Sequence, residues 1–212
     1  MFLVFQSARC IFLTFRSPAA RKIFSAGRNP AYCIYKNKKK GEKEMAKILS
    51  PTNIIFLDVD GVLNNMAYLK GKDIGEEIDM RAVERLAEIY KECDCRIVLS
   101  SSWRELCGSE TKEPHSMYRY LEDCLGKYGM EIVDVTPVIM SNRPEEIEAW
   151  LKENVNMVKN FVSLDDDFDE KHYKNFGLEG HLVKTKFYVD DETKGGLLEE
   201  HVEKAKRILK GN

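Results

Sequence analysis

Short apolar runs alternate with amphipathic stretches from residue 53 to the C-terminus. The runs are continuous in their apolar character, which is typical of strands that are buried on both faces. The stretches between them place apolar residues three or four positions apart, which predicts helices with one buried side. The predicted strands are residues 53–58, 95–100, 131–136, 160–165 and 181–185, and the predicted helices are residues 79–92, 115–128, 144–154 and 196–209.

Local signals support several of these helices. Asp79 stands where an N-cap is expected, and Pro144 falls in a first turn, where the missing backbone N–H costs nothing. The apolar spacing of the last helix predicts that it buries Leu198, Val202, Ala205 and Leu209.

The alternation of strands and helices predicts an α/β fold. We expect a three-layer, Rossmann-like parallel sheet with helices on both faces. In such sheets the ligand lies beyond the carboxyl ends of the strands. The residues that directly follow each strand are therefore the candidates for chemistry.

Charged and hydroxyl residues occupy these strand ends. They are Asp58, Asp60, Ser100, Asp165, Asp166 and Asp167, and Arg143 joins the set from the start of the helix that leads into the strand at 160–165. Carboxylates that crowd at a buried edge repel one another, and Mg²⁺ relieves that repulsion because it prefers oxygen ligands. We therefore predict a magnesium site in which Asp58 stays ionised and attacks phosphorus.

The other residues of the set suit the same reaction. Asp60 comes two positions after Asp58, so an extended backbone directs both side chains to one side, and Asp60 can hold a proton for the leaving oxygen. Ser100 can donate a hydrogen bond to a phosphoryl oxygen, and Arg143 can offset the charge that develops there. Gly61 lets the backbone turn away from the site.

These residues resemble the motifs of the haloacid dehalogenase (HAD) superfamily of aspartate-nucleophile phosphatases. The four motifs appear in order as DVDGV at 58–62, a strand ending in Ser100, Arg143, and LDDD at 164–167. The stretches LDVDGVLN, VLSSSWR, RPEEIEAWL and FVSLDDD are similar to the small HAD domains of Swiss Army Knife RNA-repair proteins. The resemblance covers roughly residues 53–199.

The resemblance implies a Mg²⁺-dependent phosphomonoester hydrolase. Asp58 would form an aspartyl-phosphate, and Asp60 would act first as acid and then as base, with its backbone carbonyl on the metal. The implied phosphate contacts are Ser100, Ser101, Gly61 and Arg143. The implied metal ligands are Asp58, Asp60, Asp165 and Asp166.

Several assignments stay open at this point. Many relatives carry lysine where this chain has Arg143, which leaves Lys152, Lys159 and Lys186 as alternatives. The sequence does not decide which of the three acids at 165–167 binds the metal. Ser101 either contacts phosphate or only caps the next segment. Trp103 either belongs to the core or lines the mouth of the substrate site. Arg104 either contacts substrate phosphate or forms a surface ion pair.

Segment lengths bear on the substrate. HAD enzymes often carry a cap domain, but residues 62–78 and 144–160 are too short to hold a full one. An open site favours a large substrate, such as a nucleic-acid end or a phosphoprotein, or a partner that completes the site. The family resemblance implies an RNA or DNA terminal phosphate. The net charge of −10 over residues 45–212 opposes strong nonspecific binding of nucleic acid. The alternative is a catalytically weak HAD-fold module for binding or scaffolding.

The first 44 residues differ in composition from residues 45–212. They hold ten Lys and Arg and two acids, a net charge of +8. This pattern predicts a basic, disordered segment: a transit peptide to the mitochondrial matrix, or a mis-assigned start that places the true start at Met45 and the protein in the cytoplasm. We expect the hydrolase domain to span 45–212. No apolar run approaches the ~18 residues that cross a bilayer, and the sequence does not indicate an oligomeric state.

Overall fold

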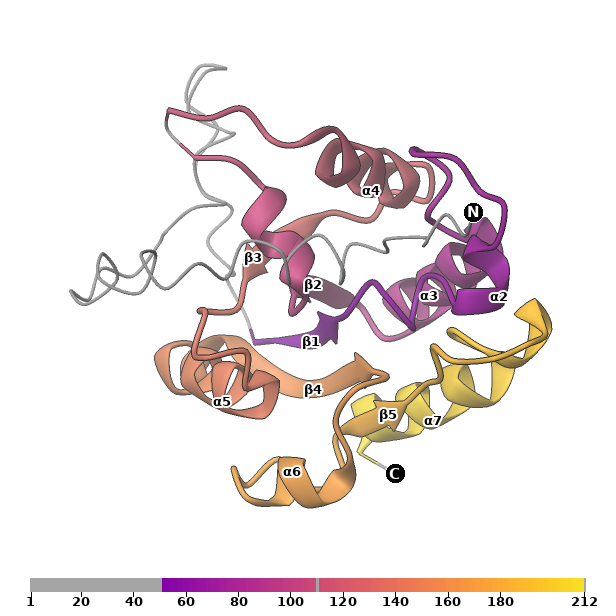
Figure 1. Cartoon of the computed structure of the whole chain (residues 1–212). Helices are drawn as coiled ribbons and strands as arrows, with labels where there is room; N and C mark the ends of the chain where they lie inside the picture. The colour runs from indigo at the N-terminus through magenta and orange to yellow at the C-terminus, as the bar shows by residue number, and fades with distance from the viewer. Residues whose placement is uncertain (1–50, 110, 212) are drawn as a thin grey trace. The chain divides into compact units, whose positions relative to one another are not determined.

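Five parallel strands form one sheet in the computed structural model, which describes residues 51–109 and 111–211. They are β1 (Thr52–Leu57), β2 (Cys95–Leu99), β3 (Ile132–Val135), β4 (Val158–Asp165) and β5 (Leu182–Lys184). The order is β3-β2-β1-β4-β5, with β1 in the centre (Figure 1). Every neighbouring pair is parallel, which confirms the predicted α/β fold.

The connections between strands are mostly helical. The α-helices are α2 (Met66–Leu69), α3 (Met80–Glu92), α4 (Ser116–Gly126), α5 (Arg143–Glu153), α6 (Glu170–Lys174) and α7 (Glu199–Lys210). The 3₁₀ turns are η3 (Ser102–Leu106), η4 (Val155–Met157) and η5 (Glu192–Lys194). The four predicted helices correspond to α3, α4, α5 and α7. The shorter helices were not predicted, because one turn is too short to show a helical period.

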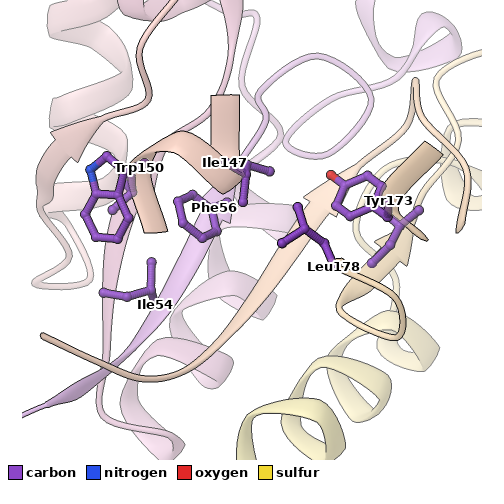
Figure 2. Packing of buried hydrophobic residues seen from close by; sticks show 8 residues of the cluster. Ile54, Phe56, Ile147, Trp150, Tyr173 and Leu178 are labelled. Carbon is purple, nitrogen blue, oxygen red and sulfur yellow. The ribbon is translucent and has the colours of Figure 1, made fainter. Parts of the chain in front are cut away.

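One face of the sheet packs against α5 and α6. Phe56 of β1 lies at the centre of this layer, and its ring meets the Trp150 ring of α5 edge to face, with 5.4 Å between centroids. Figure 2 shows these side chains together with their neighbours. The buried cluster comprises Ile54, Phe56, Val98, Ile147, Trp150, Tyr173, Leu178 and Leu182.

The opposite face packs against α3 and α7, which contact each other and strands β2, β4 and β5. Asp79 caps α3 by accepting a hydrogen bond from the Arg81 N–H, as predicted. The prediction for α7 was wrong at one residue. Leu198 is the N-cap and is only half-buried, whereas Leu197 before it is buried, because the helix begins at Glu199.

The described residues all lie within one compact unit. The predicted boundary after residue 44, the transit peptide and the alternative start at Met45 all fall outside the described residues. No helix among the described residues is long and apolar enough to cross a membrane.

Candidate active site

The register of β1 and β4 brings two carboxylates together. Leu57 pairs with Leu164, so the residues that follow, Asp58 and Asp165, emerge side by side at the carboxyl edge. The Asp58 N–H donates to the Leu164 carbonyl at 3.1 Å, which fixes this junction. The Asp58 carboxylate in turn accepts from the Val59 N–H at 2.8 Å.

Three acids converge at this edge. Carboxylate oxygens of Asp58, Asp165 and Asp166 lie within 4.8 Å of one another. Asp58 and Asp165 are buried, with 4% and 0% of their surface exposed, and Asp166 is half-buried. A set of oxygen ligands with this spacing suits a hard dication. Asp60 is predicted to contribute its backbone carbonyl, which this set of carboxylate oxygens does not test.

Arg143 joins the cluster from the first position of α5. Its Nη1 donates to Asp58 Oδ2 and, at 2.8 Å, to Asp165 Oδ2. Burial opposes its charge, but the two carboxylates outweigh burial and hold the Arg143 pKa well above its ordinary value. Burial raises the pKa of Asp58 to about 6, and Arg143 limits this rise. The guanidinium therefore supplies much of the charge balance of the cluster.

Asp60 is held by two neutral donors. Asn64 Nδ2 donates to Asp60 Oδ1 at 3.0 Å, and Trp103 Nε1 donates to Asp60 Oδ2 at 3.1 Å. Asn64 also accepts from the Gly61 N–H at 3.1 Å, so it fixes the turn as well as the acid. Asn64 was not among the predicted site residues. The available signal was an amide four residues after Asp60 in a predicted tight turn.

The serines after β2 lie beside the cluster. The Ser100 N–H donates to the Leu57 carbonyl at 2.8 Å, and Thr136 Oγ1 donates to Ser100 Oγ at 3.5 Å. Ser101 hydrogen-bonds the Asp58 carboxylate, which lowers the Asp58 pKa against the larger effect of burial. Ser101 also caps η3. Thr136, at the end of β3, is a buried hydroxyl that the sequence analysis did not select.

A comparison with models of protein families gave a match for this chain. The model for the HAD domain in Swiss Army Knife RNA repair proteins matches residues 54–202, more than half of the chain. The chain belongs to this family. Neither the curated proteins nor the solved structures gave a match. The acidic cluster of this HAD domain is consistent with a HAD metal site.

The chain has four candidate basic residues for the third motif of the HAD domain. Arg143 reaches the carboxylates, as described above. Lys152 pairs with Glu148 on the outer side of α5, and Lys159 lies at the start of β4, the opposite end of that strand. Lys186 is exposed beyond β5. The contacts to the cluster therefore favour Arg143 among the four for this role.

Trp103 and Arg104 both have partners inside the HAD domain. Trp103 is 1% exposed and bonds to Asp60. Arg104 forms an ion pair with Glu146 at 2.9 Å. The pair is buried, whereas the sequence analysis considered an ion pair on the surface. The substrate contact of either side chain stays a prediction. Asp167 is exposed, and its backbone N–H donates to Asp165 Oδ1 at 2.7 Å.

Glycine is required at position 61 because the Asp166 side chain lies very close to its Cα. Its φ is +81°, and a Cβ at this position would overlap the Asp166 side chain. Gly61→Ala is therefore expected to cost about 1–2 kcal/mol in backbone strain, plus roughly 1–3 kcal/mol from the overlap. It should also displace Asp166 and so weaken the binding of a metal ion at the acidic cluster.

Gly71 provides the matched control for this prediction. It has a φ of +79°, and a Cβ added there would meet no atom within 4 Å, so Gly71→Ala tests the strain alone. Urea denaturation of both variants and titration calorimetry with Mg²⁺ measure the two effects. Equal stability losses and unchanged Mg²⁺ affinity in both variants would contradict the role assigned to the overlap.

Proposed function

We propose that this HAD domain is a Mg²⁺-dependent phosphomonoesterase that works through an aspartyl-phosphate on Asp58. The observation that carries the proposal is the buried cluster of Asp58, Asp165 and Asp166 with Arg143 at the carboxyl edge of the sheet. Family membership supports it, since HAD domains are typically phosphohydrolases.

The donor set fits magnesium. All three groups are carboxylates, with no thiolate or imidazole among them, as a hard dication prefers. Asp58, Asp165 and Asp166 would hold the ion. When bound, Mg²⁺ would offset the mutual repulsion of the carboxylates and polarise a phosphoryl oxygen.

The residues of the chain divide the reaction between them. Asp58 Oδ attacks phosphorus, and the bond from phosphorus to the leaving oxygen breaks as Asp60 gives that oxygen a proton. Asp60 then takes a proton from a water molecule, which attacks the aspartyl-phosphate and releases inorganic phosphate. The hydrogen bonds from Asn64 and Trp103 orient Asp60 for both transfers.

The phosphoryl oxygens need donors while charge develops on them. Arg143 is close enough to serve as such a donor, because its guanidinium already contacts Asp58, the attacking group. Ser100 and Ser101 lie at the end of the adjacent strand β2, and we assign their hydroxyls to phosphate. We further propose an RNA or DNA end as the substrate, which is supported by the family's occurrence in RNA-repair proteins.

Hydrolysis of p-nitrophenyl phosphate tests the proposal. We expect wild-type turnover with Mg²⁺, none above background in EDTA, and a loss of at least about 10³-fold in Asp58→Asn, because the amide is not a nucleophile toward phosphorus. The variant should fold, since the amide avoids the burial cost that raises the pKa of Asp58.

Asp94→Asn is the matched control. Asp94 is exposed, precedes β2 at the opposite edge of the sheet, and has a φ of 48°, which asparagine also adopts readily. Its turnover should equal that of the wild type. A wild-type protein that is folded but inert toward p-nitrophenyl phosphate and phosphorylated oligonucleotides would instead support a binding or scaffold module.

A further inference from the structure

The chain from the last residue of β5 to Tyr188 exposes two amines and one aromatic ring. Burial alternates along it: Thr185 and Phe187 are buried, whereas Lys184, Lys186 and Tyr188 are exposed. We name these three exposed residues the rim strip. Tyr188 is 72% exposed, so most of its ring faces solvent.

Backbone hydrogen bonds fix this segment against the candidate active site. The Thr185 N–H donates to the Asp165 carbonyl at 3.0 Å, and the Phe187 carbonyl accepts from the Met66 N–H at 2.9 Å. Lys184 Nζ donates to the carbonyl of Asp166. The rim strip therefore begins at the carboxylate cluster and ends beside α2, in the chain between β5 and α7 (Figure 1).

The charges of the rim strip are available to a ligand. Among the described residues, neither Lys184 nor Lys186 forms an ion pair with a carboxylate. Of the three acids that follow, Asp190 is exposed two residues after Tyr188, and the other two have partners within their own segment or on α3. Asp191 accepts from Thr193 at the start of η5, and Glu192 pairs with Arg81 at 3.2 Å.

The ring of Tyr188 is held in place. It meets the buried Phe187 ring edge to face, with 5.1 Å between centroids and 88° between planes. One face of an exposed ring in this arrangement can stack on a planar group. Four residues of chain span at most about 14 Å, so Lys184 and Tyr188 are separated by no more than the reach of one or two nucleotides.

Resting on the proposed function, we propose that the rim strip binds the nucleotide next to the terminal phosphate of a single-stranded nucleic-acid end. Lys186 neutralises the adjoining phosphodiester, and Tyr188 stacks on a base. The net charge of −10 over residues 45–212 repels the rest of the strand. Recognition is thereby confined to the end, and a long positively charged groove is not needed.

Binding to the full chain in the Asp58→Asn background, with Mg²⁺, tests this inference without turnover. Fluorescence anisotropy compares 5′- and 3′-phosphorylated single-stranded tetranucleotides with the matching phosphorylated mononucleotides as competitors. The favoured tetranucleotide should bind at least about ten-fold more tightly than its mononucleotide. Tyr188→Ala should remove most of this difference, since one base–aromatic stack supplies that much affinity.

Lys186→Ala should reduce the slope of log affinity against log salt by about 0.7, the value for one phosphate of a single strand. Lys159→Ala and Val155→Ala serve as controls. Both residues are exposed near the start of β4, at the opposite edge of the sheet. Neither control should change the affinity or the salt slope, and melting temperatures should show that all four variants fold.

The outcomes separate this inference from the proposed function. Absence of wild-type turnover of p-nitrophenyl phosphate counts against the proposed function, whatever the binding shows. Tetranucleotides that bind no more tightly than mononucleotides overturn the rim strip, as do Tyr188→Ala and Lys186→Ala variants that match their controls. A phosphopeptide bound more tightly than every tetranucleotide also overturns it.

Discussion

Arg143→Met is expected to lower the free energy of unfolding by about 3–5 kcal/mol at pH 7.5 in EDTA. Methionine keeps much of the apolar volume of arginine but removes the only cation that contacts Asp58 and Asp165 among the described residues. Both carboxylates are buried and would be left as uncompensated charges. Under the proposed function, turnover should fall as well, because the phosphoryl oxygens would lose their guanidinium donor.

The stability loss of Arg143→Met should depend on pH, and the pKa of Asp58 determines whether it grows or shrinks as the pH rises. Burial raises this pKa from 3.8 to about 6, and Arg143 opposes the rise, so the variant should have a still higher value. A carboxyl group with a raised folded-state pKa favours folding below its unfolded pKa, and this contribution is lost as pH rises through the folded pKa. The difference between variant and wild type should therefore be largest above pH 6 and shrink toward pH 4.

Urea denaturation from pH 4 to pH 8 in EDTA measures this difference. Arg143→Lys keeps a cation and should recover part of the stability, although a single ammonium cannot reproduce the guanidinium geometry. Arg207→Met controls for the chemistry of the substitution at an exposed position of α7. A stability loss in Arg143→Met that is the same at pH 4 and pH 8 would show that lost packing, and not charge balance, is responsible.

The strand ends were predictable because one register rule governs them. Parallel strands with continuous apolar runs end at one edge, and this alone places Asp58 beside Asp165. The partners of the site residues were not predictable in this way. Trp103 is 43 residues from Asp60, and Arg104 is 42 residues from Glu146. Such contacts depend on how η3 and α5 pack, which no local pattern specifies.

Arg143 illustrates where the sequence argument ends. Its place at the start of a helix that leads into β4 was readable from the chain, and this favoured it as the basic residue of the site. That one nitrogen contacts two carboxylates was not readable, because it depends on the path of the preceding loop. Met140 and Ser141 in that loop have φ values of 49° and 60°, and apolar or polar patterning does not predict left-handed residues.

Glu146→Leu is expected to destabilise the protein by about 3–5 kcal/mol. The variant leaves Arg104 as a buried guanidinium without its carboxylate, since the side chains of Arg104 and Glu146 are 6% and 1% exposed. Burial already lowers the pKa of Arg104, and Glu146 opposes that shift. Burial likewise raises the pKa of Glu146 against the effect of Arg104. Both shifts favour the neutral forms, so desolvation costs more than the attraction returns.

A double variant should therefore regain the stability that the single variant loses. Arg104→Met/Glu146→Leu removes both charges and replaces them with apolar side chains of similar length, which leaves no unpaired buried charge. Urea denaturation should place the double variant within about 1 kcal/mol of the wild type, or above it. A double variant as unstable as Glu146→Leu would show that the cost comes from packing.

Restored stability should not restore turnover, because Glu146 has a second task. Its Oε1 accepts a hydrogen bond from the Ile139 N–H at 2.8 Å, and this anchors the left-handed loop that leads to Arg143. Leucine cannot accept that bond, so the double variant should stay below the wild type in kcat for p-nitrophenyl phosphate. Glu146→Gln keeps an acceptor and should retain most of the rate. Full activity of the double variant would mean that packing of α5 alone positions Arg143.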